Sequence, residues 1–296
     1  MGGTEMSKIS IRFYKDHEVR AVWDEENSKW WFSVLDVVGA INDQSDYNKN
    51  RNYWKYLKTK LRKEGNELVS ATNQLKLLAA DGKRYNTDVL DAEGITLLAK
   101  YTKNLRAMDF LDWFTYSDNT IDGQSKKKAY AFWESNLVAD KDVGKVKSLQ
   151  QIHAYLFGGL YGFAGKIRTK TISKGKTIFC LAEHLHQYLQ TVENMPDTTF
   201  DEIVDKYVEM NMAHPFLEGN GRSTRIWLDL ILKKRLGRCV DWSKIGKWDY
   251  LNAMIESEMD SSKIRTLLSK ALTDRIYDRE IFMKGIDYSY YYEQED

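Results

Sequence analysis

The first third of the chain alternates apolar and polar residues in short runs before it changes to a helical period. Three strand-like runs, the last two separated by a Glu-Asn-Ser turn, cover residues 9–14, 18–24 and 30–33. Apolar residues then recur at helical spacing over 34–41, and a longer helix-like stretch covers 92–114. The pattern predicts an α+β domain with a small antiparallel sheet.

The pattern breaks at a polar stretch, residues 116–128, which contains Gly and Ser but no apolar periodicity. This composition is typical of a linker, and we place the linker at 119–128, between an N-terminal domain at 6–118 and a second domain at 129–296. The second domain has helical periodicity almost throughout. Its exception, residues 168–179, alternates around a Ser-Lys-Gly-Lys turn. We therefore expect an all-α domain with one β-hairpin.

The length and composition of the chain agree with two globular domains and favour a cytoplasmic location. The 296 residues exceed the usual length of one domain, and 43% of them are hydrophobic. Since neither an apolar run of about 18 residues nor a secretory leader occurs, we expect no membrane contact and a cytoplasmic location. Cys180 and Cys239 belong to no metal-binding spacing and suit a reducing cytosol. With a net charge of +1, any attraction to nucleic acid has to be local.

The twelve residues HPFLEGNGRSTR, at 214–225, lie between two predicted helices. The helix before them carries a possible capping box, Thr199 with Glu202, and the helix after them is expected to end at Gly237. A Gly-Asn-Gly segment that enters a helix N-terminus favours an anion such as phosphate, because free N–H groups and the helix dipole point at it.

Four side chains of this segment supply chemistry for a nucleotide reaction. Arg222 and Arg225 lie three apart on one helix face, so both can reach one polyphosphate. Glu218 offers an oxygen ligand for Mg²⁺, and His214, with an ordinary pKa near ~6.5, can accept a hydroxyl proton. Each element alone is common in polar loops with solvated arginines. The conjunction of all four favours an active site.

Residues 214–225 resemble the signature of the Fic family, which is His-x-Phe, an acidic residue, Gly-Asn-Gly-Arg and a second Arg. The segment IHAYLFGGLYGFAGKIRT, at 152–169, resembles the family's approach to its flap, and the hairpin at 168–179 resembles the flap. The resemblance implies a Fic fold whose flap aligns a target segment as an added strand. The flap residues would be Thr171, Ile172, Ser173, Lys174 and Gly175.

The resemblance implies transfer of AMP from ATP to a Ser, Thr or Tyr hydroxyl of a target protein, with release of pyrophosphate. His214 would be the general base, Glu218 would hold Mg²⁺, and Phe216 would anchor the loop in the core. The ATP phosphates would be bound by Gly219, Asn220, Gly221, Arg222 and Arg225. Bacterial relatives with short Fic cores are similar in class to toxins that act on type II topoisomerases, so such a subunit is the first candidate target.

The tail SYYYE places Ser289 and Glu293 four apart, on one face of a terminal helix expected at about 287–296. It resembles the family's inhibitory pattern of Ser or Thr, three residues and Glu, although Gln294 stands where the family has Gly or Asn. The resemblance implies that Glu293 pairs with Arg225 and that ATP then binds unproductively. Removal of AMP with the help of the same glutamate stays an alternative. Candidate acceptors for self-modification are Tyr290, Tyr291 and Tyr292.

The N-terminal domain carries a basic stripe with aromatic residues at 49–63. Two interpretations stay open: a helix that binds DNA phosphates, or a solvated helix face whose aromatic side chains enter the core. The order of motifs resembles the BRO-N domain of phage antirepressors, so DNA binding is a hypothesis, with candidate contacts at Lys49, Arg51, Lys55, Lys58, Lys60 and Arg62. The rival to an autoinhibited adenylyltransferase is thus a DNA-binding regulator with a regulatory Fic module. Formation of a homo-oligomer stays open.

Overall fold

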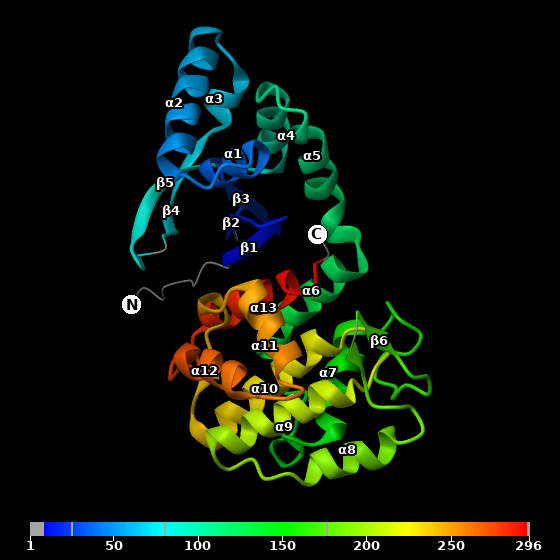
Figure 1. Ribbon diagram of the computed structural model, residues 1–296. Helices are drawn as coiled ribbons and strands as arrows, with labels where there is room; N and C mark the ends of the chain where they lie inside the picture. Colours follow the sequence, from blue (N-terminus) through cyan, green and yellow to red (C-terminus); the bar gives the residue numbers. More distant parts are fainter. Residues whose placement is uncertain (1–8, 25, 80, 176, 295–296) are drawn as a thin grey trace. The chain divides into compact units, whose positions relative to one another are not determined.

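The computed structural model describes residues 9–24, 26–79, 81–175 and 177–294. The chain divides into two compact units after Thr120 (Figure 1). The predicted start of the first domain at Met6 and the predicted end of the terminal helix at Asp296 lie outside the described residues. Of the helices that are described, none is both long enough and apolar enough to cross a membrane.

The N-terminal unit contains a five-stranded antiparallel sheet with the strand order β1-β2-β3-β5-β4. The three predicted strands are confirmed as β1 (Ile9–Tyr14), β2 (His17–Asp24) and β3 (Lys29–Ser33). Two further strands were not predicted, because polar residues interrupt their apolar alternation. They are β4 (Asn73–Leu78) and β5 (Arg84–Leu90).

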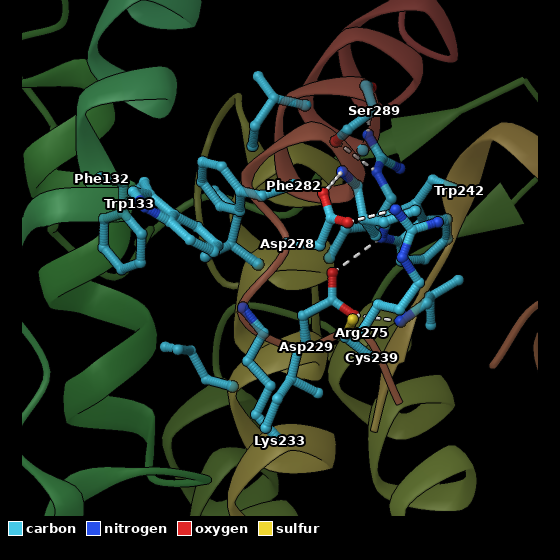
Figure 2. Close-up of a pocket in the computed structure, with 18 of the residues that line it drawn as sticks. Phe132, Trp133, Asp229, Lys233, Cys239, Trp242, Arg275, Asp278, Phe282 and Ser289 are labelled. Carbon is cyan, nitrogen blue, oxygen red and sulfur yellow. Dashed lines mark hydrogen bonds and ion pairs between the residues drawn. The ribbon is translucent and has the colours of Figure 1, made fainter. Parts of the chain in front are cut away.

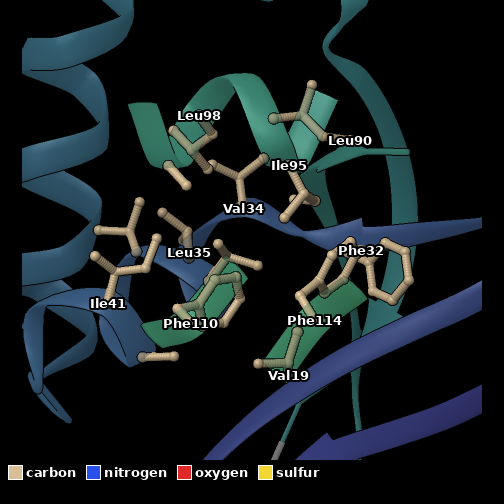
Figure 3. Close-up of a cluster of buried hydrophobic side chains, with 14 of the residues drawn as sticks. Val19, Phe32, Val34, Leu35, Ile41, Leu90, Ile95, Leu98, Phe110 and Phe114 are labelled. Carbon is tan, nitrogen blue, oxygen red and sulfur yellow. The ribbon is translucent and has the colours of Figure 1, made fainter. Parts of the chain in front are cut away.

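Helices cover this sheet and share one core with it. They are α1 (Val34–Asn42), α2 (Tyr47–Lys63), α3 (Glu67–Ala71), α4 (Ala92–Tyr101) and α5 (Arg106–Tyr116). The core contains Val34, Ile95 and Phe110, which are fully buried (Figure 3). Because each buried side chain of this kind contributes about 1.5–3 kcal/mol, the cluster holds α1, α4 and α5 against the sheet.

The continuous helix predicted at 92–114 is wrong, since the chain turns between α4 and α5. Lys103 has a left-handed backbone with φ 50°. Asn104 donates through Nδ2 to the carbonyl oxygen of Ile41 at 3.0 Å, and its Oδ1 accepts from the N–H of Arg106 at 3.0 Å. These side-chain hydrogen bonds favour a turn over a continuous helix, and apolar spacing carries no sign of them.

The stretch predicted as a linker, 119–128, is mostly helical. A short 3-10 turn, η1 (Ser117–Asn119), is followed by α6 (Ile121–Ala131). Ser125 and Ala129 are buried, and α6 packs against the last helix of the chain. Because only these small side chains are fully buried, the segment lacks the large apolar residues that would show its helical period in the sequence.

The C-terminal unit is mostly helical, as predicted. Its longer helices are α7 (Val146–Phe157), α8 (Leu185–Asn194), α9 (Phe200–Ala213), α10 (Asn220–Leu236), α11 (Lys247–Glu256), α12 (Ser262–Ala271) and α13 (Arg279–Tyr291). Short 3-10 turns are η2 (Phe132–Glu134), η3 (Asp140–Asp142) and η4 (Trp242–Lys244). Helix α10 packs against α7, α9 and α13, so it lies at the centre of this unit.

Two short antiparallel pairings accompany these helices. The predicted hairpin is present, with β6 (Ser173–Lys174) paired to β7 (Thr177–Ile178). A second pairing, β8 (Cys239–Val240) with β9 (Leu272–Thr273), was not predicted. The predicted stop of α10 at Gly237 is confirmed, because Gly237 has φ 61° and closes the helix.

Candidate active site

The loop between α9 and α10 takes its shape from local hydrogen bonds. The predicted capping box of Thr199 and Glu202 starts α9, which ends at His214. Asn220 accepts from the N–H of Phe216 through Oδ1 at 2.8 Å and donates through Nδ2 to its carbonyl oxygen at 2.7 Å. The side chain of Asn220, predicted to bind ATP, thus uses both polar atoms to close the loop.

Glycine is required where this loop enters α10. Gly219 has φ 81°, a left-handed backbone that residues with a Cβ avoid. A Cβ at Gly219 would also lie 2.4 Å from Cε2 of Phe157. Both the backbone and the packing therefore exclude a side chain at Gly219, and the loop lies close to α7.

His214 is held as a neutral base. Its Nδ1 lies 3.0 Å from the carbonyl oxygen of Asn211. Because a carbonyl oxygen only accepts, Nδ1 carries the proton and Nε2 keeps its lone pair. Burial lowers the pKa of His214 to about 4, against the opposing effects of the Asn211 hydrogen bond and of Glu293. The ring stacks on Phe179 with centroids 3.6 Å apart. The imidazole can therefore accept a proton at neutral pH.

Phe216 anchors the loop through a histidine that sequence analysis left without a role. Phe216 is fully buried and stacks on His153, with ring centroids 3.8 Å apart. Nε2 of His153 donates to the carbonyl oxygen of Glu218 at 2.8 Å, and Nδ1 accepts from the N–H of Gly165 at 2.8 Å. Burial lowers the pKa of His153 to about 4. The neutral ring therefore fixes the backbone around the acidic residue of the loop.

Arg168, a second residue without a predicted role, ties the loop to the hairpin. Its side chain is buried, and its hydrogen bonds within the described residues go to backbone carbonyl oxygens. Nε donates to His214 at 2.7 Å, Nη1 to Lys170 at 2.6 Å, and Nη2 to Cys180 at 2.5 Å and Ala213 at 3.1 Å. The guanidinium thus fixes His214 relative to both ends of the hairpin.

The first arginine of α10 lies between two carboxylates. Arg222 is buried, with Nη2 donating to Oε1 of Glu218 at 2.8 Å and Nη1 donating to Oδ1 of Asp122 in α6. The Glu218 side chain is 55% exposed, so it can reach a Mg²⁺ that phosphates and water also hold. Within the described residues, no three acidic, His or Cys side chains form a metal cluster.

The second arginine, Arg225, is enclosed by the end of the chain. Its Nη2 donates to Oε1 of Glu293 at 2.6 Å and to the carbonyl oxygen of Ser289 at 2.7 Å, and Nε donates to Oγ of Ser289 at 2.7 Å. The guanidinium also lies against the rings of Tyr250 and Tyr292. Burial alone would raise the pKa of Glu293, but the charge of Arg225 holds it at about 2. Glu293 is therefore ionised at physiological pH.

The terminal helix expected at about 287–296 begins earlier and ends sooner. Helix α13 starts after Asp278, whose side chain accepts from the N–H groups of the first turn, and Glu293 lies in the turn that follows it. The N–H of Glu293 donates to the carbonyl oxygen of Tyr290 at 3.2 Å. The four-residue spacing therefore brings Ser289 and Glu293 to one guanidinium, although only Ser289 lies on the helix.

The carboxylate of Glu293 rests against the N-terminal turn of α10. A Cβ on Gly221 would lie 2.1 Å from its Oε1. A helix N-terminus attracts anions through its free N–H groups and its dipole. A carboxylate of the chain itself thus lies where the sequence predicts that an anion binds.

The hairpin lies next to this carboxylate. Nζ of Lys174 lies 3.5 Å from Oε2 of Glu293, and the base of the hairpin is fixed because the N–H of Cys180 donates to the carbonyl oxygen of Met212 at 3.0 Å. Of the predicted flap residues, Ile172 is half-buried and the others are exposed: Thr171, Ser173, Lys174 and Gly175. A fixed base with an open outer edge is suited to adding a strand.

The three tail tyrosines point into the C-terminal unit. Each is at most 9% exposed. The hydroxyl of Tyr290 lies 2.5 Å from Oγ of Ser125, and that of Tyr292 donates to the carbonyl oxygens of Trp242 and Ile245. Burial raises the pKa of Tyr290 and Tyr292. With α13 docked in this way, the hydroxyls of Tyr290 and Tyr292 are engaged within the unit and all three side chains are buried.

A cavity of about 120 Å³ lies beside the contact of Arg225 with Ser289, between α10 and α13 (Figure 2). Asp229 lines it and accepts from the N–H of Val240 at 2.8 Å and from Nε1 of Trp242 at 2.9 Å, and burial raises the pKa of Asp229 to about 6. The aromatic side of the cavity is formed by Phe132, Trp133 and Phe282. Helix α13 is therefore incompletely packed where it holds Arg225.

In the N-terminal unit, α2 turns most of its basic side chains outward. Lys58 is half-buried and pairs with Asp88 at 2.7 Å, and Trp54 lies in the core and donates to the same carboxylate. Tyr56 is 70% exposed. The exposed basic residues of the predicted set are Lys49, Arg51, Lys55, Lys60 and Arg62. Trp54 fits the interpretation in which the aromatic side chains of α2 enter the core. The exposed basic residues on the same helix stay compatible with binding of DNA phosphates.

Comparison with known proteins adds relatives for the C-terminal unit. The chain is 29% identical over 147 residues to the protein adenylyltransferase VbhT of Bartonella schoenbuchensis, which covers 45% of this chain and 30% of VbhT. It is 30% identical over 118 residues to the "Probable protein adenylyltransferase y4lH" of Sinorhizobium fredii. This alignment covers 36% of this chain and 61% of y4lH. The chain thus spans less than two thirds of the length of either relative.

Among solved structures, the BepC protein of Bartonella tribocorum, determined with bound AMPPNP, aligns with 52% of this chain and 84% of its own, at 20% identity and a TM-score of 0.45. Residues 145–232 match the model of the Fic/DOC family. These residues include the whole loop from His214 to Arg225, whereas the N-terminal unit and α13 lie outside them. The similarity to the Fic/DOC family is therefore shown for residues 145–232 of this chain.

Proposed function

We propose that the protein transfers AMP from ATP to a Ser, Thr or Tyr hydroxyl of a target protein. The observation that carries this proposal is a neutral His214 with a free Nε2 on the same loop that delivers the N-terminus of α10 and two buried arginines. Of the relatives that align with part of this chain, VbhT carries the name "Protein adenylyltransferase" and y4lH the name "Probable protein adenylyltransferase".

In the proposed reaction, Nε2 of His214 accepts the proton of the acceptor hydroxyl while its oxygen forms a bond to the α phosphorus of ATP. The bond from the α phosphorus to the bridging oxygen breaks, and pyrophosphate leaves with the electron pair. The α10 N-terminus, Arg222 and Arg225 stabilise the negative charge on the phosphates. Glu218 would hold the Mg²⁺ that accompanies ATP and neutralises part of this charge.

The resting protein is inhibited by its own C-terminus in this proposal. The support is the ionised Glu293, which takes a donor of Arg225 and lies against Gly221. Both the arginine and the helix N-terminus would otherwise receive phosphate oxygens. ATP therefore binds productively only when Glu293 leaves, and the same carboxylate could later position water for removal of AMP.

Transfer of label from α-labelled ATP tests the proposal. Wild type, Glu293→Gly and the double variant Glu293→Gly/His214→Asn are compared in a bacterial lysate, with purified type II topoisomerase as the first added target. Asn is chosen because it tolerates the left-handed backbone of His214. We expect strong label with Glu293→Gly, weak label with wild type and none with the double variant, and no label from γ-labelled ATP. Equal labelling by the double variant would contradict the role of His214.

DNA binding by the N-terminal unit is a second candidate function, favoured by the exposed basic face of α2. We expect wild type to shift duplex DNA and the shift to weaken steeply with salt, because basic residues displace counterions from phosphates. The triple variant Lys49→Gln/Lys55→Gln/Arg62→Gln should weaken the shift and flatten its salt dependence. A shift that is absent, or independent of salt, would argue against this candidate.

A further inference from the structure

We infer that α6 is a second inhibitory element, in which Asp122 blocks Arg222 while Ser125 and Lys126 hold α13 in place. The inference deepens the proposed function and rests on it, because it concerns the regulation of the same ATP site. It starts from one observation: each arginine of the loop is paired with a carboxylate from a distant part of the chain.

Asp122 is placed to compete with a phosphate for Arg222. The carboxylate accepts from Nη1 of Arg222 and is 49% exposed, whereas the Arg222 side chain is buried. Nε of Arg222 is buried without a hydrogen-bond partner among the described residues. A buried guanidinium that still has an unused donor binds a multidentate anion better than a single carboxylate. ATP would therefore displace Asp122 when it binds Arg222.

The same helix also holds α13. Nζ of Lys126 pairs with Asp287 of α13 at 2.7 Å, and the Asp287 side chain is fully buried. Oγ of Ser125 lies 2.5 Å from the hydroxyl of Tyr290. Tyr130 donates to the carboxylate of Asp287 as well. Because a buried carboxylate is costly once its partner is removed, these contacts keep α13 docked and Glu293 on Arg225.

The side of α13 that faces α10 and the side that faces α6 are held differently. On its α10 side, α13 borders the cavity beside Ser289. A helix that lines a cavity makes fewer packing contacts there and is stabilised less. On its α6 side it gains the ion pair and the hydrogen bonds just described. Helix α6 directly follows Thr120, the last residue of the N-terminal unit. Helix α6 thus contacts Arg222 directly, through Asp122, and acts on Arg225 indirectly, through α13.

The first test weakens the hold of α6 on α13 without touching the ATP site. AMP transfer from α-labelled ATP is measured for wild type, Lys126→Gln, Ser125→Ala and Glu293→Gly, with Lys270→Gln as the control that removes an exposed lysine of α12. We expect Lys126→Gln to raise transfer about tenfold or more, since it leaves a buried carboxylate undercompensated. Ser125→Ala loses one hydrogen bond and should raise transfer about two- to fivefold. Lys270→Gln should match wild type.

The second test asks whether Asp122 competes with ATP. In the Glu293→Gly background, Asp122→Asn should lower the KM for ATP about two- to fivefold, because a half-exposed pair is worth at most about 1 kcal/mol. A raised KM would show that Asp122 positions Arg222 for ATP, which would overturn the inference.

The outcomes separate this inference from the proposed function. No transfer by any variant, Glu293→Gly included, rejects the adenylyltransferase. Transfer by Glu293→Gly together with wild-type levels for both Ser125→Ala and Lys126→Gln rejects only the role of α6. Circular dichroism and thermal unfolding establish that each variant is folded. Should Lys126→Gln unfold, the milder Ser125→Ala decides, since its single lost hydrogen bond leaves the ion pair in place.

Discussion

The carbonyl oxygen of Asn211 lies 3.0 Å from Nδ1 of His214, and this contact decides which nitrogen of the ring is basic. Both residues come from the last turn of α9 and its end, so the tautomer is fixed by the way the helix stops. Burial then lowers the pKa of His214 to about 4. The structure therefore supplies a base that is fully deprotonated at cellular pH, although it is a weaker base than an exposed histidine.

We expect His214 to titrate well below an ordinary histidine. The imidazole carbon resonances of the five histidines are followed by NMR as pH is lowered, and the signal of His214 is assigned by its loss in His214→Asn. Its midpoint should lie near pH 4, where burial places the pKa. A midpoint near ~6.5, the value of an exposed histidine, would contradict the buried, neutral ring. Because the pKa of Glu293 is about 2, acid should not release the inhibitory carboxylate first.

The same shifts predict how stability depends on pH. His153 and His214 both have a folded-state pKa of about 4, below the ~6.5 of an unfolded chain. The unfolded chain therefore binds more protons between these values, and stability is lost as pH falls from ~6.5 towards ~4. Urea unfolding of the whole chain at pH 7.5 and pH 5 should show this loss, and a variant with both histidines replaced by Asn should show less of it. Equal pH dependence of both proteins would contradict the prediction.

Arg168→Met should destabilise the protein and slow AMP transfer. The variant keeps the apolar stem but leaves four carbonyl oxygens without their donor, at a cost of about 3 kcal/mol or more. Arg168→Lys restores one charged donor and should recover part of the loss. Urea unfolding measures the stability, and the Glu293→Gly background makes transfer measurable. If Arg168 only stabilised the fold, kcat at saturating ATP would be unchanged in protein that remains folded.

Local features of this chain were readable from sequence, and long-range partners were not. The capping box of Thr199, the stop at Gly237 and the loop between them follow from residues a few positions apart. Arg168 reaches His214 across 46 positions and Arg222 reaches Asp122 across 100. No periodicity links such pairs, because they are set by how helices pack.

Segments rich in small or polar residues were the other reason why elements of the fold were not predicted from the sequence. Helix α6 buries only small side chains, so its sequence lacks an apolar stripe and was interpreted as a linker. Strands β4 and β5 alternate too weakly to be recognised. On α2, sequence could not separate Lys58, which pairs with Asp88, from the exposed lysines of the same stripe, since the partner lies on a strand that was itself missed.

Gly219→Ala should cost much more stability than Gly237→Ala. Both glycines have left-handed backbones, with φ 81° and φ 61°, so both substitutions share a backbone cost of about 1–2 kcal/mol. Only at Gly219 would the new Cβ meet a neighbour, the ring of Phe157 at 2.4 Å, whereas at Gly237 nothing lies within 4 Å. The difference between the two in urea unfolding therefore measures the close approach of the loop to α7. Equal losses would show that the ring moves aside.

Two variants of Glu293 separate the effect of its charge from the effect of the space it fills. Glu293→Gly removes both and should raise AMP transfer by roughly 10- to 100-fold, the size expected for a charged hydrogen bond to a buried arginine. Glu293→Gln keeps the side chain beside Gly221 and an acceptor for Arg225 but removes the ionic attraction. It should give an intermediate rate and a KM for ATP above that of Glu293→Gly. Glu256→Gln, which removes a partly exposed carboxylate on α11, is the control and should match wild type. If Glu293→Gln transfers AMP as fast as Glu293→Gly, the inhibition is electrostatic; if it matches wild type, occupation of the phosphate position is enough to keep ATP out.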